Sequence, residues 1–396
     1  MKKWLLIIAS VILIAALIGW FSLDKHLRVL ILNPPKDENV LFWSTEQRDA
    51  GFRLIDQLDM LPKATIKAAD SSVALPQGQP LTLDASWLDE AMQTQRIAGL
   101  VVLQNGEVRL ERYGLDFSAE DKWTSFSVAK SFTSTLVGAA LKDGFISSLD
   151  DPVSQYITEM QGSNYDDVTI AQLLTMTSGI QWNEDYADPN SDVSKFNFHQ
   201  PEPGMDVTAS YMRTLARAHP PGTTYWYSTG ETNLIGLLVS RATQQPLASY
   251  LSEKIWSKLG AEHDASWVLG PTGHEISGCC IQASTRDFAR FGQFILNGAK
   301  VNGESIVPAD WFSKATTAQV NTNLAEFAYG YQWWIKGDGS FQGRGIFGQG
   351  IFIDPARNLV IAVNGNWPVA SHRDWVAQRQ ALYRTIQQAI DHEQGR

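Results

Sequence analysis

Cysteine is scarce in this sequence: there are two in 396 residues, and these two, Cys279 and Cys280, are adjacent. Adjacent cysteines cannot form the usual disulfide between distant segments of a chain. We expect two small buried side chains, an interpretation preferred here to a redox or metal-binding role. The sequence also contains no His-Glu-x-x-His and no Cys-x-x-Cys motif, so it predicts neither a metal centre nor a cofactor.

Positive charge is also in short supply. Lysine and arginine total 32 against 42 acidic residues, which gives a net charge of −10, and no basic run stands out. Because nucleic-acid binding depends on clustered basic residues, the sequence argues against such a partner. It also lacks a Gly-x-Ser-x-Gly elbow and a phosphate-binding glycine loop. Hydrophobic residues make up 44% of the chain, enough for a sizeable core in one large domain or two modest ones.

One long uncharged apolar run is present, from Trp4 to Leu23, and it is long enough to cross a bilayer as a helix. It exceeds the core of a signal peptide, and no small-x-small cleavage site follows it. We therefore expect a single membrane anchor that is retained, with a cleaved signal peptide as the alternative. Lys2 and Lys3 favour an N-terminus inside the cytoplasm and a catalytic domain outside it, periplasmic or extracellular. Basic residues just after the run weaken that orientation.

The chain divides into three parts in this interpretation. Residues 1–26 form the anchor. Residues 27–84 are irregular and contain a Ser/Pro/Gly/Gln-rich stretch, so we interpret them as a connector or strap between membrane and body. Residues 85–396 form the body, with a mostly helical region over about 130–318.

Strand patterns occur at both ends of the body. Asn105-Gly106 separates two apolar-rich runs and predicts a hairpin over residues 99–113. Further strands are predicted at 329–336, 346–353 and 358–364, followed by a helix over about 373–394. We expect an α+β fold in which one antiparallel sheet is built from both ends of the body. Helices would flank the sheet, with the helical region inserted into it.

Ser127 and Lys130 form a Ser-x-x-Lys motif at a predicted helix start. Residues three apart lie on one helix face, so the hydroxyl and the amine can meet. Serine becomes a good nucleophile only when a base takes its proton, and a lysine of lowered pKa can be that base. A helix N-terminus also offers free N–H groups to a developing oxyanion.

Several separated motifs accompany this pair. They are FSVAKSFT at 126–133, LDDPV at 149–153, VTIAQLLTMTSGI at 168–180, PPGTTYWYSTG at 220–230, STRDFARFG at 284–292 and GIFGQGIFIDP at 345–355. Together they resemble the serine β-lactamase and penicillin-binding-protein superfamily, in its class C and esterase-like branch. Within that superfamily the chain looks most like the 6-aminohexanoate-dimer (nylon-oligomer) hydrolases. The resemblance implies a β-lactamase-like fold.

The resemblance also assigns roles. Ser127 would be the acylated nucleophile, Lys130 its base, and Tyr227 a phenol that shares their proton and delivers it to the leaving group. The backbone N–H groups of Ser127 and Ile346 would form the oxyanion hole, with Ile346 on the strand beside the nucleophile. Without the resemblance, Tyr227 in its aromatic cluster would be interpreted as a core residue.

Two positions depart from the β-lactam-recognising pattern. Gly343-Arg344-Gly345 stands where a Lys-Thr-Gly triplet on an edge strand is expected, and Thr229 stands where an asparagine is usual. Residues 181–189 resemble the loop that covers the substrate in the oligomer hydrolases, and its carboxylates would receive an amine. An acidic surface loop and a surface arginine are the alternatives. The candidate substrate-binding residues are Trp182, Asp185, Tyr186, Asp188 and Arg344.

The sequence thus predicts a membrane-tethered serine hydrolase that cleaves small esters or linear amides through an acyl-enzyme on Ser127. One alternative is a penicillin-binding, β-lactamase or D-alanyl carboxypeptidase activity. Another is a non-catalytic relative that binds cell-wall peptides. The expected partners are a small ester or amide substrate and the membrane around the N-terminal helix, whereas the oligomeric state stays open.

Overall fold

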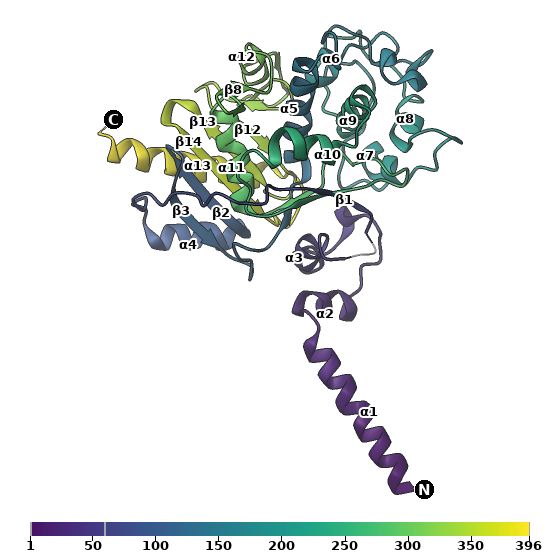
Figure 1. Cartoon of the computed structure of the whole chain (residues 1–396), viewed down its shortest axis with the longest axis vertical. Helices are drawn as coiled ribbons and strands as arrows, with labels where there is room; N and C mark the ends of the chain where they lie inside the picture. Colours follow the sequence, from purple (N-terminus) through teal and green to yellow (C-terminus); the bar gives the residue numbers. More distant parts are fainter. Residues whose placement is uncertain (1, 59–60, 396) are drawn as a thin grey trace.

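The computed structural model describes residues 2–58 and 61–395. Met1 and Arg396, at the ends of the expected anchor and body, lie outside the described residues, as do residues 59–60. Helix α1 (Lys2–Ser22) stands apart from the rest of the chain (Figure 1). It contains the one candidate membrane span among the described residues, Lys3–Ser22, and none of that span is buried. An exposed apolar helix of this length near the N-terminus is either a signal sequence or an anchor.

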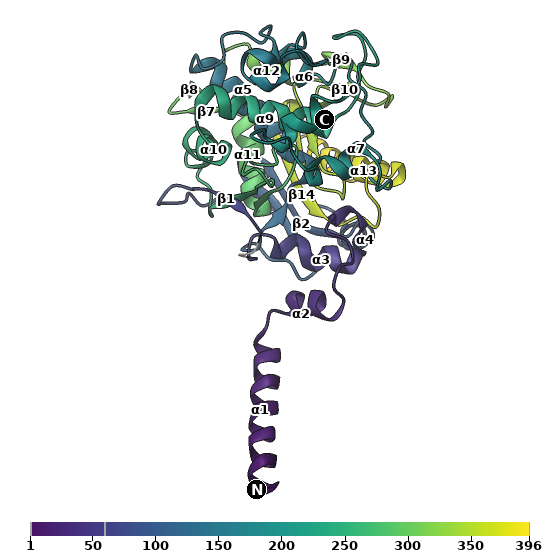
Figure 2. The same ribbon diagram turned by 90° about the vertical axis from the view of Figure 1, so that its right-hand side faces the viewer.

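Residues 27–84 contain more regular structure than the sequence predicted. Both views place α2 (Lys25–Leu32) and α3 (Thr45–Leu54) between α1 and the body (Figures 1 and 2). The short η1 (Val40–Phe42) precedes α3. Helix α3 begins with a capping box formed by Ser44 and Gln47. Its Phe52 is fully buried and packs edge-on against two aromatic rings of the body, so this segment contributes to the core.

The largest element is an eight-stranded antiparallel sheet. In sheet order its strands are β3 (Glu107–Tyr113), β2 (Ile97–Gln104), β14 (Leu359–Gly365), β13 (Gly350–Asp354), β12 (Phe341–Arg344), β11 (Trp334–Ile335), β10 (Ala328–Tyr329) and β9 (Val320–Asn321). The predicted hairpin is confirmed as β2–β3. Strand β2 also pairs with β14, which confirms that the two ends of the body share one sheet (Figure 1).

Helices cover both faces of this sheet, because successive side chains of a strand point to opposite faces. On β2, Leu100 and Val102 pack with α4 (Ala85–Thr94) and α13 (Arg373–Glu393). Val101 and Leu103 belong to the larger core that includes α5 (Ala129–Lys142) and α11 (Thr285–Leu296). The predicted α+β class and the final helix are confirmed.

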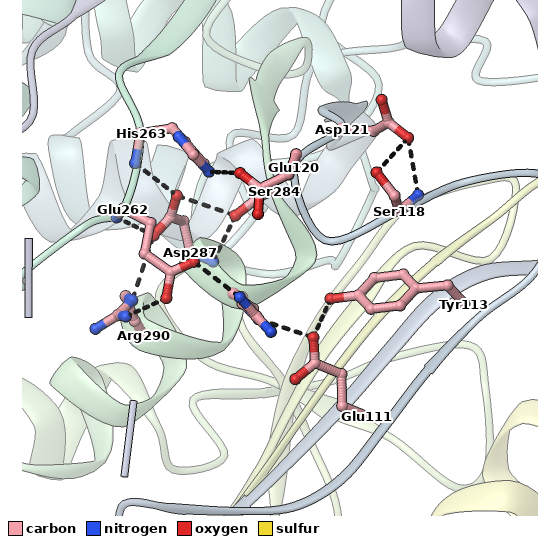
Figure 3. A network of polar contacts seen from close by, with 11 residues as sticks. Glu111, Tyr113, Ser118, Glu120, Asp121, Glu262, His263, Ser284, Asp287 and Arg290 are labelled. Carbon is pink, nitrogen blue, oxygen red and sulfur yellow. Dashed lines mark hydrogen bonds and ion pairs between the residues drawn. The ribbon is translucent and has the colours of Figure 1, made fainter. Parts of the chain in front are cut away.

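A polar network fixes the start of α11 beside β3 (Figure 3). Ser284 caps the helix by accepting the N–H of Asp287 at 3.0 Å. Arg286 donates to Glu111 of β3 at 2.8 Å, and Arg290 donates to Glu262 at 2.6 Å. These ion pairs are partly buried and share partners, so they act as one clamp between the helix and the sheet.

The inserted region is helical, but it also contains short strands that the sequence did not predict. Besides α5 and α11, its helices are α6 (Ile170–Leu174), α7 (Asp192–Lys195), α8 (Val207–Met212), α9 (Thr229–Thr243), α10 (Leu247–Leu251) and α12 (Trp311–Ala315). Two of its strands pair with two strands that precede the region, in a second sheet of order β1 (Lys63–Ile66), β5 (Ala265–Val268), β6 (Ile281–Ala283) and β4 (Trp123–Thr124). A small hairpin joins β7 (Lys300–Val301) and β8 (Glu304–Ser305).

Candidate active site

Ser127 lies in a single 3₁₀ turn, Phe126–Val128, that leads directly into α5. The preceding Phe126 has a left-handed backbone, with φ of 43°, which is uncommon for a bulky residue. Ser125 holds the chain here, because its N–H donates to the Ile281 carbonyl at 2.8 Å and its hydroxyl accepts the Ile281 N–H at 3.0 Å. The second sheet therefore fixes the backbone that carries Ser127.

Lys130 projects from the first turn of α5 and is fully buried. Its Nζ donates to Thr229 Oγ1 at 3.0 Å and to the Gly278 carbonyl at 2.8 Å. Burial lowers the pKa of Lys130 to about 8, and the negative charge of Glu184 opposes part of that shift. A lysine of this pKa has a substantial neutral fraction near neutral pH and can accept a proton.

Tyr227 completes the group that the sequence predicted. Its phenol lies near enough to the Ser127 side chain for the two to affect each other's ionisation, and its ring centroid lies 5.4 Å from Lys130 Nζ. Burial raises the pKa of Tyr227, as does the nearby Glu184 charge, whereas the Ser127 side chain lowers it. The phenol is therefore protonated at neutral pH. The structure brings Ser127, Lys130 and Tyr227 together from segments almost 100 residues apart.

The expected position of Ile346 needs correction. It lies in the turn between β12 and β13 and not on a strand, since Gly345 N–H donates to the Gln349 carbonyl at 2.8 Å and closes the turn. The turn packs directly on the nucleophile segment: a Cβ on Gly345 would lie 2.8 Å from the Ser125 carbonyl oxygen. A side chain at Gly345 would therefore separate Ile346 from Ser127.

We expected the triplet at 343–345 on an edge strand, but β12 does not lie at the edge of the sheet. It pairs with β13 on one side and with β11 on the other. However, β11 pairs only with Phe341 and Gln342, so the end of β12 at Gly343 and Arg344 extends beyond it. The short length of β11 leaves this end of β12 beside the candidate site.

A cavity of about 700 Å³ adjoins these residues and is lined by Tyr227, Arg344 and Ile346. Much of its wall is aromatic. The aromatic residues are Tyr186, Tyr227, Phe327, Trp334 and Trp367. Its size is that of a small-molecule site.

Glu184 also lines this cavity, although it was not among the residues predicted for the site. Its carboxylate accepts the Thr229 N–H at 2.9 Å and the Tyr186 hydroxyl at 2.8 Å. It also accepts the Thr229 hydroxyl and the Trp182 indole N–H. Glu184 and Lys130 thus meet at Thr229, one as acceptor and one as donor. The resemblance of residues 181–189 to a substrate-covering loop was a signal for it, but an acidic residue in a polar loop resembles a surface residue.

The other predicted loop residues lie in different places. Tyr186 lines the cavity. Trp182 is buried against Phe196, with ring centroids 5.5 Å apart, and it packs the loop onto the core. Asp185 accepts the Ala187 N–H at 2.9 Å and lines a neighbouring cavity, whereas Asp188 accepts the Asn190 N–H at 2.8 Å within the loop. The carboxylate beside Lys130 is therefore Glu184.

Arg344 lies in the cavity wall and not on the open surface. Its guanidinium stacks near two rings, 4.9 Å from the centroid of Phe327 and 4.7 Å from that of Trp334. Its Nη1 is buried and has no hydrogen-bond partner among the described atoms. An unpaired buried donor is unfavourable, so a carboxylate or carbonyl of a ligand would stabilise it.

The expectation for the two cysteines was wrong. Cys279 and Cys280 are bonded to each other and are only partly buried. Cys280 has a left-handed backbone, with φ of 78°. The pair directly follows Gly278, whose carbonyl accepts a hydrogen bond from Lys130 Nζ. Separately, no group of three or more His, Cys, Asp or Glu side chains is placed to hold a metal ion within residues 2–58 and 61–395.

Comparison with known proteins gives concordant results. The profile of the Beta-lactamase family matches residues 85–383. A 6-aminohexanoate-dimer hydrolase of Paenarthrobacter ureafaciens is 29% identical over 357 residues, 84% of this chain and 89% of the relative. A beta-lactamase of Pseudomonas fluorescens is 30% identical over 190 residues, 45% of this chain and 48% of that protein.

Solved structures confirm the fold. A candidate 6-aminohexanoate-dimer hydrolase from Bacillus anthracis superposes with a TM-score of 0.76 at 22% identity, covering 88% of this chain and 94% of that one. A family VIII carboxylesterase gives a TM-score of 0.58 at 17% identity, covering 78% of this chain and 99% of that one. These likenesses establish the predicted architecture.

Proposed function

Because the chain belongs to the beta-lactamase family of serine hydrolases, as its motifs predicted, we propose that it hydrolyses small esters or linear amides through an acyl-enzyme on Ser127. One observation carries this proposal: Lys130, whose pKa burial lowers to about 8, lies close to the Tyr227 ring, and the pKa of the Tyr227 phenol responds to the Ser127 side chain. A binding protein without chemistry has no need of a buried lysine beside a serine hydroxyl and a phenol.

In the proposed mechanism Ser127 Oγ attacks the substrate carbonyl carbon, and its proton passes to the Lys130–Tyr227 pair. The negative oxygen of the tetrahedral intermediate accepts the backbone N–H groups of Ser127 and Ile346. The carbon–leaving-group bond then breaks as Tyr227 returns the proton to the departing oxygen or nitrogen. Water repeats the attack on the acyl-enzyme, and the same groups remove and return its proton.

The surroundings of Lys130 support a role as base. The amine loses its charge more readily because it is buried, and the Glu184 carboxylate, linked to it through Thr229, limits that effect. Glu184 is thus a positioning residue that sets the proton affinity of the base. The Thr229 hydroxyl bonds to both groups and has little capacity left for substrate.

The site favours esters and linear amides over β-lactams. Arg344 replaces the polar triplet expected of lactam-binding members, and Thr229 is already committed to Lys130 and Glu184. The 29% identity to a 6-aminohexanoate-dimer hydrolase supports a linear amide, and an ester has the better leaving group. Arg344 Nη1 would accommodate a substrate carboxylate or carbonyl.

The test is kcat/KM for nitrocefin, p-nitrophenyl butyrate and the linear 6-aminohexanoate dimer on one enzyme preparation. Each lost polar contact weakens transition-state binding by about 1–3 kcal/mol, so two losses predict a handicap of roughly a hundredfold for nitrocefin. A nitrocefin value equal to or above both others would return the protein to the lactam-hydrolysing members.

For location, we propose that α1 is retained as a single anchor over residues 1–26 and that the body over residues 85–396 lies outside the cytoplasm. The support is the apolar surface of α1, which is exposed along the whole span Lys3–Ser22. Residues 27–84 would connect the anchor to the body. The truncations described in the Discussion test this arrangement.

A further inference from the structure

A second cavity, of about 450 Å³, adjoins the first. Glu184, Tyr186 and Ser371 line both cavities, so the two spaces meet at these residues. Together they exceed the volume that a short ester needs. The second cavity therefore borders the one that Tyr227 lines, and nothing in the proposed hydrolysis of a small substrate uses it.

Seven of the twelve residues that line the second cavity are apolar. Leu41 and Phe42 come from η1, Phe347 from the turn that carries Ile346, and Val369 from the loop before α13. Val369 is 48% exposed, although it is a large hydrophobic side chain. Apolar side chains around an open space gain stability when an apolar ligand displaces water from them.

Two of the three charged side chains of this cavity are occupied by protein partners. Arg48 donates to Asn366 Oδ1 at 2.9 Å, to the Trp367 carbonyl at 3.0 Å and to the Pro368 carbonyl at 2.9 Å. Glu184 accepts four donors. Asp185 is exposed and accepts one N–H, that of Ala187, through Oδ1, which leaves its Oδ2 to solvent. Away from Asp185, the chemistry of the second cavity therefore suits an uncharged chain.

We infer that the second cavity is a subsite for a long apolar arm of the substrate. It would lie past Tyr186 against Leu41 and Phe42, while the carbonyl carbon sits at Ser127. The substrate class would then be an ester or amide that carries a flexible alkyl chain. This inference deepens the proposed function and rests on it. It also gives η1 and α3 a role, since the segment that follows the apolar helix α1 builds the wall of the subsite.

Chain-length dependence tests the subsite. Each buried methylene contributes up to about fourfold in binding, so kcat/KM should rise from p-nitrophenyl butyrate to p-nitrophenyl decanoate. V369D places a charge in the apolar wall at an exposed position, where folding tolerates it. We expect V369D to lower the decanoate-to-butyrate ratio at least tenfold. V73D is the matched control, because Val73 is 65% exposed and lines neither cavity, and it should keep the wild-type ratio.

A binding measurement separates this inference from the proposed hydrolysis. Isothermal titration of decanamide, a non-ionic long-chain amide, into the S127A protein should show binding that V369D added to S127A weakens at least tenfold. Decanamide binding without hydrolysis of any ester would support the subsite and contradict the proposed chemistry. Ester hydrolysis with equal kcat/KM for butyrate and decanoate, and no effect of V369D on either readout, would overturn the subsite alone.

Discussion

The Lys130 side chain has its chemistry set by its surroundings. The same residue on a surface would stay protonated, whereas burial beside Thr229 and Gly278 brings its pKa to about 8. Glu184 acts in the opposite direction, because its negative charge favours the protonated amine. The balance between burial and this one carboxylate determines the pH at which the base becomes available.

The pH dependence of hydrolysis follows from this balance. In the wild type, kcat/KM should rise with pH along an acid limb whose midpoint lies near pH 8, as Lys130 loses its proton. E184Q removes the charge that holds the Lys130 pKa up, so the limb should move to lower pH. E326Q is the control, because Glu326 is an exposed carboxylate in the wall of the same cavity. Profiles of p-nitrophenyl butyrate hydrolysis between pH 5 and 10 measure both. A limb that stays fixed or moves upward in E184Q would contradict this account.

Single residues were predicted unevenly from the sequence. Ser127, Lys130, Tyr227, Tyr186 and Arg344 all reach the candidate site, because their motifs fix residue type and spacing together. Asp185 and Asp188 do not line the cavity beside Tyr227. Each carboxylate accepts a backbone N–H from within its own loop. Choosing Glu184 among the carboxylates of its loop requires knowing which one meets Thr229, and that depends on long-range packing of the loop against α9.

At the scale of elements, the turn between β12 and β13 is the part most closely coupled to chemistry. It carries Ile346 and touches the backbone just before Ser127, so its approach to α5 sets the distance between the two N–H groups of the proposed oxyanion hole. Gly345 permits that approach, since an added Cβ would lie 2.8 Å from the Ser125 carbonyl oxygen and 2.6 Å from Gln349 Oε1. Because the Ser125 carbonyl is a backbone group, the clash can be relieved only if the turn and the Ser125 segment move apart.

G345A should therefore lower kcat much more than it lowers stability. Loss of one oxyanion donor typically reduces kcat by about 10²–10³, and a partial displacement of the Ile346 N–H should reduce it by roughly tenfold to a hundredfold. G337A is the matched control, because an added Cβ there meets nothing within 4 Å. Steady-state kinetics and thermal melts of both variants decide the point. Equal kcat for G345A and G337A would remove the turn from the mechanism.

Elements with local signals were predicted, and elements that depend on distant pairing were not. Asn105-Gly106 identified the β2–β3 hairpin because the turn type needs those residues. The second sheet was not predicted. Its strands β1, β4, β5 and β6 are two to four residues long and lie far apart in sequence. Such short strands show no periodicity of their own. The Cys279–Cys280 bond was missed because the expectation considered only long-range disulfides.

On the scale of the whole molecule, the helices of the N-terminal segment differ in how they contact the core. Helix α1 makes no buried contribution, whereas α3 inserts Phe52 among the rings of Trp123, Phe126 and Phe347. The exposed apolar helix α1 is thus separate from the core, whereas α3 is part of it. A boundary between them should exist within the first 45 residues.

Two truncations locate that boundary. Removing residues 1–23 should give a soluble protein with wild-type ester hydrolysis, because only α1 is lost. Removing residues 1–58 also deletes Phe52 and Arg48, and loss of a buried phenylalanine alone reduces stability by about 3–5 kcal/mol. We expect that protein to be unstable and inactive. Membrane fractionation, thermal melts and kcat measure these outcomes. Full-length protein found in the soluble fraction with its N-terminus trimmed would identify α1 as a cleaved signal peptide.

The central claim is that Ser127 carries the acyl group. Its most direct test is labelling of the wild-type protein with a fluorophosphonate, followed by peptide mapping, with p-nitrophenyl butyrate turnover measured in parallel. The label should be found on Ser127, and S127A, which removes one hydroxyl and little volume, should lose both label and turnover while keeping its thermal melting temperature. A label on another residue, or S127A retaining more than a few per cent of wild-type kcat, would contradict the account.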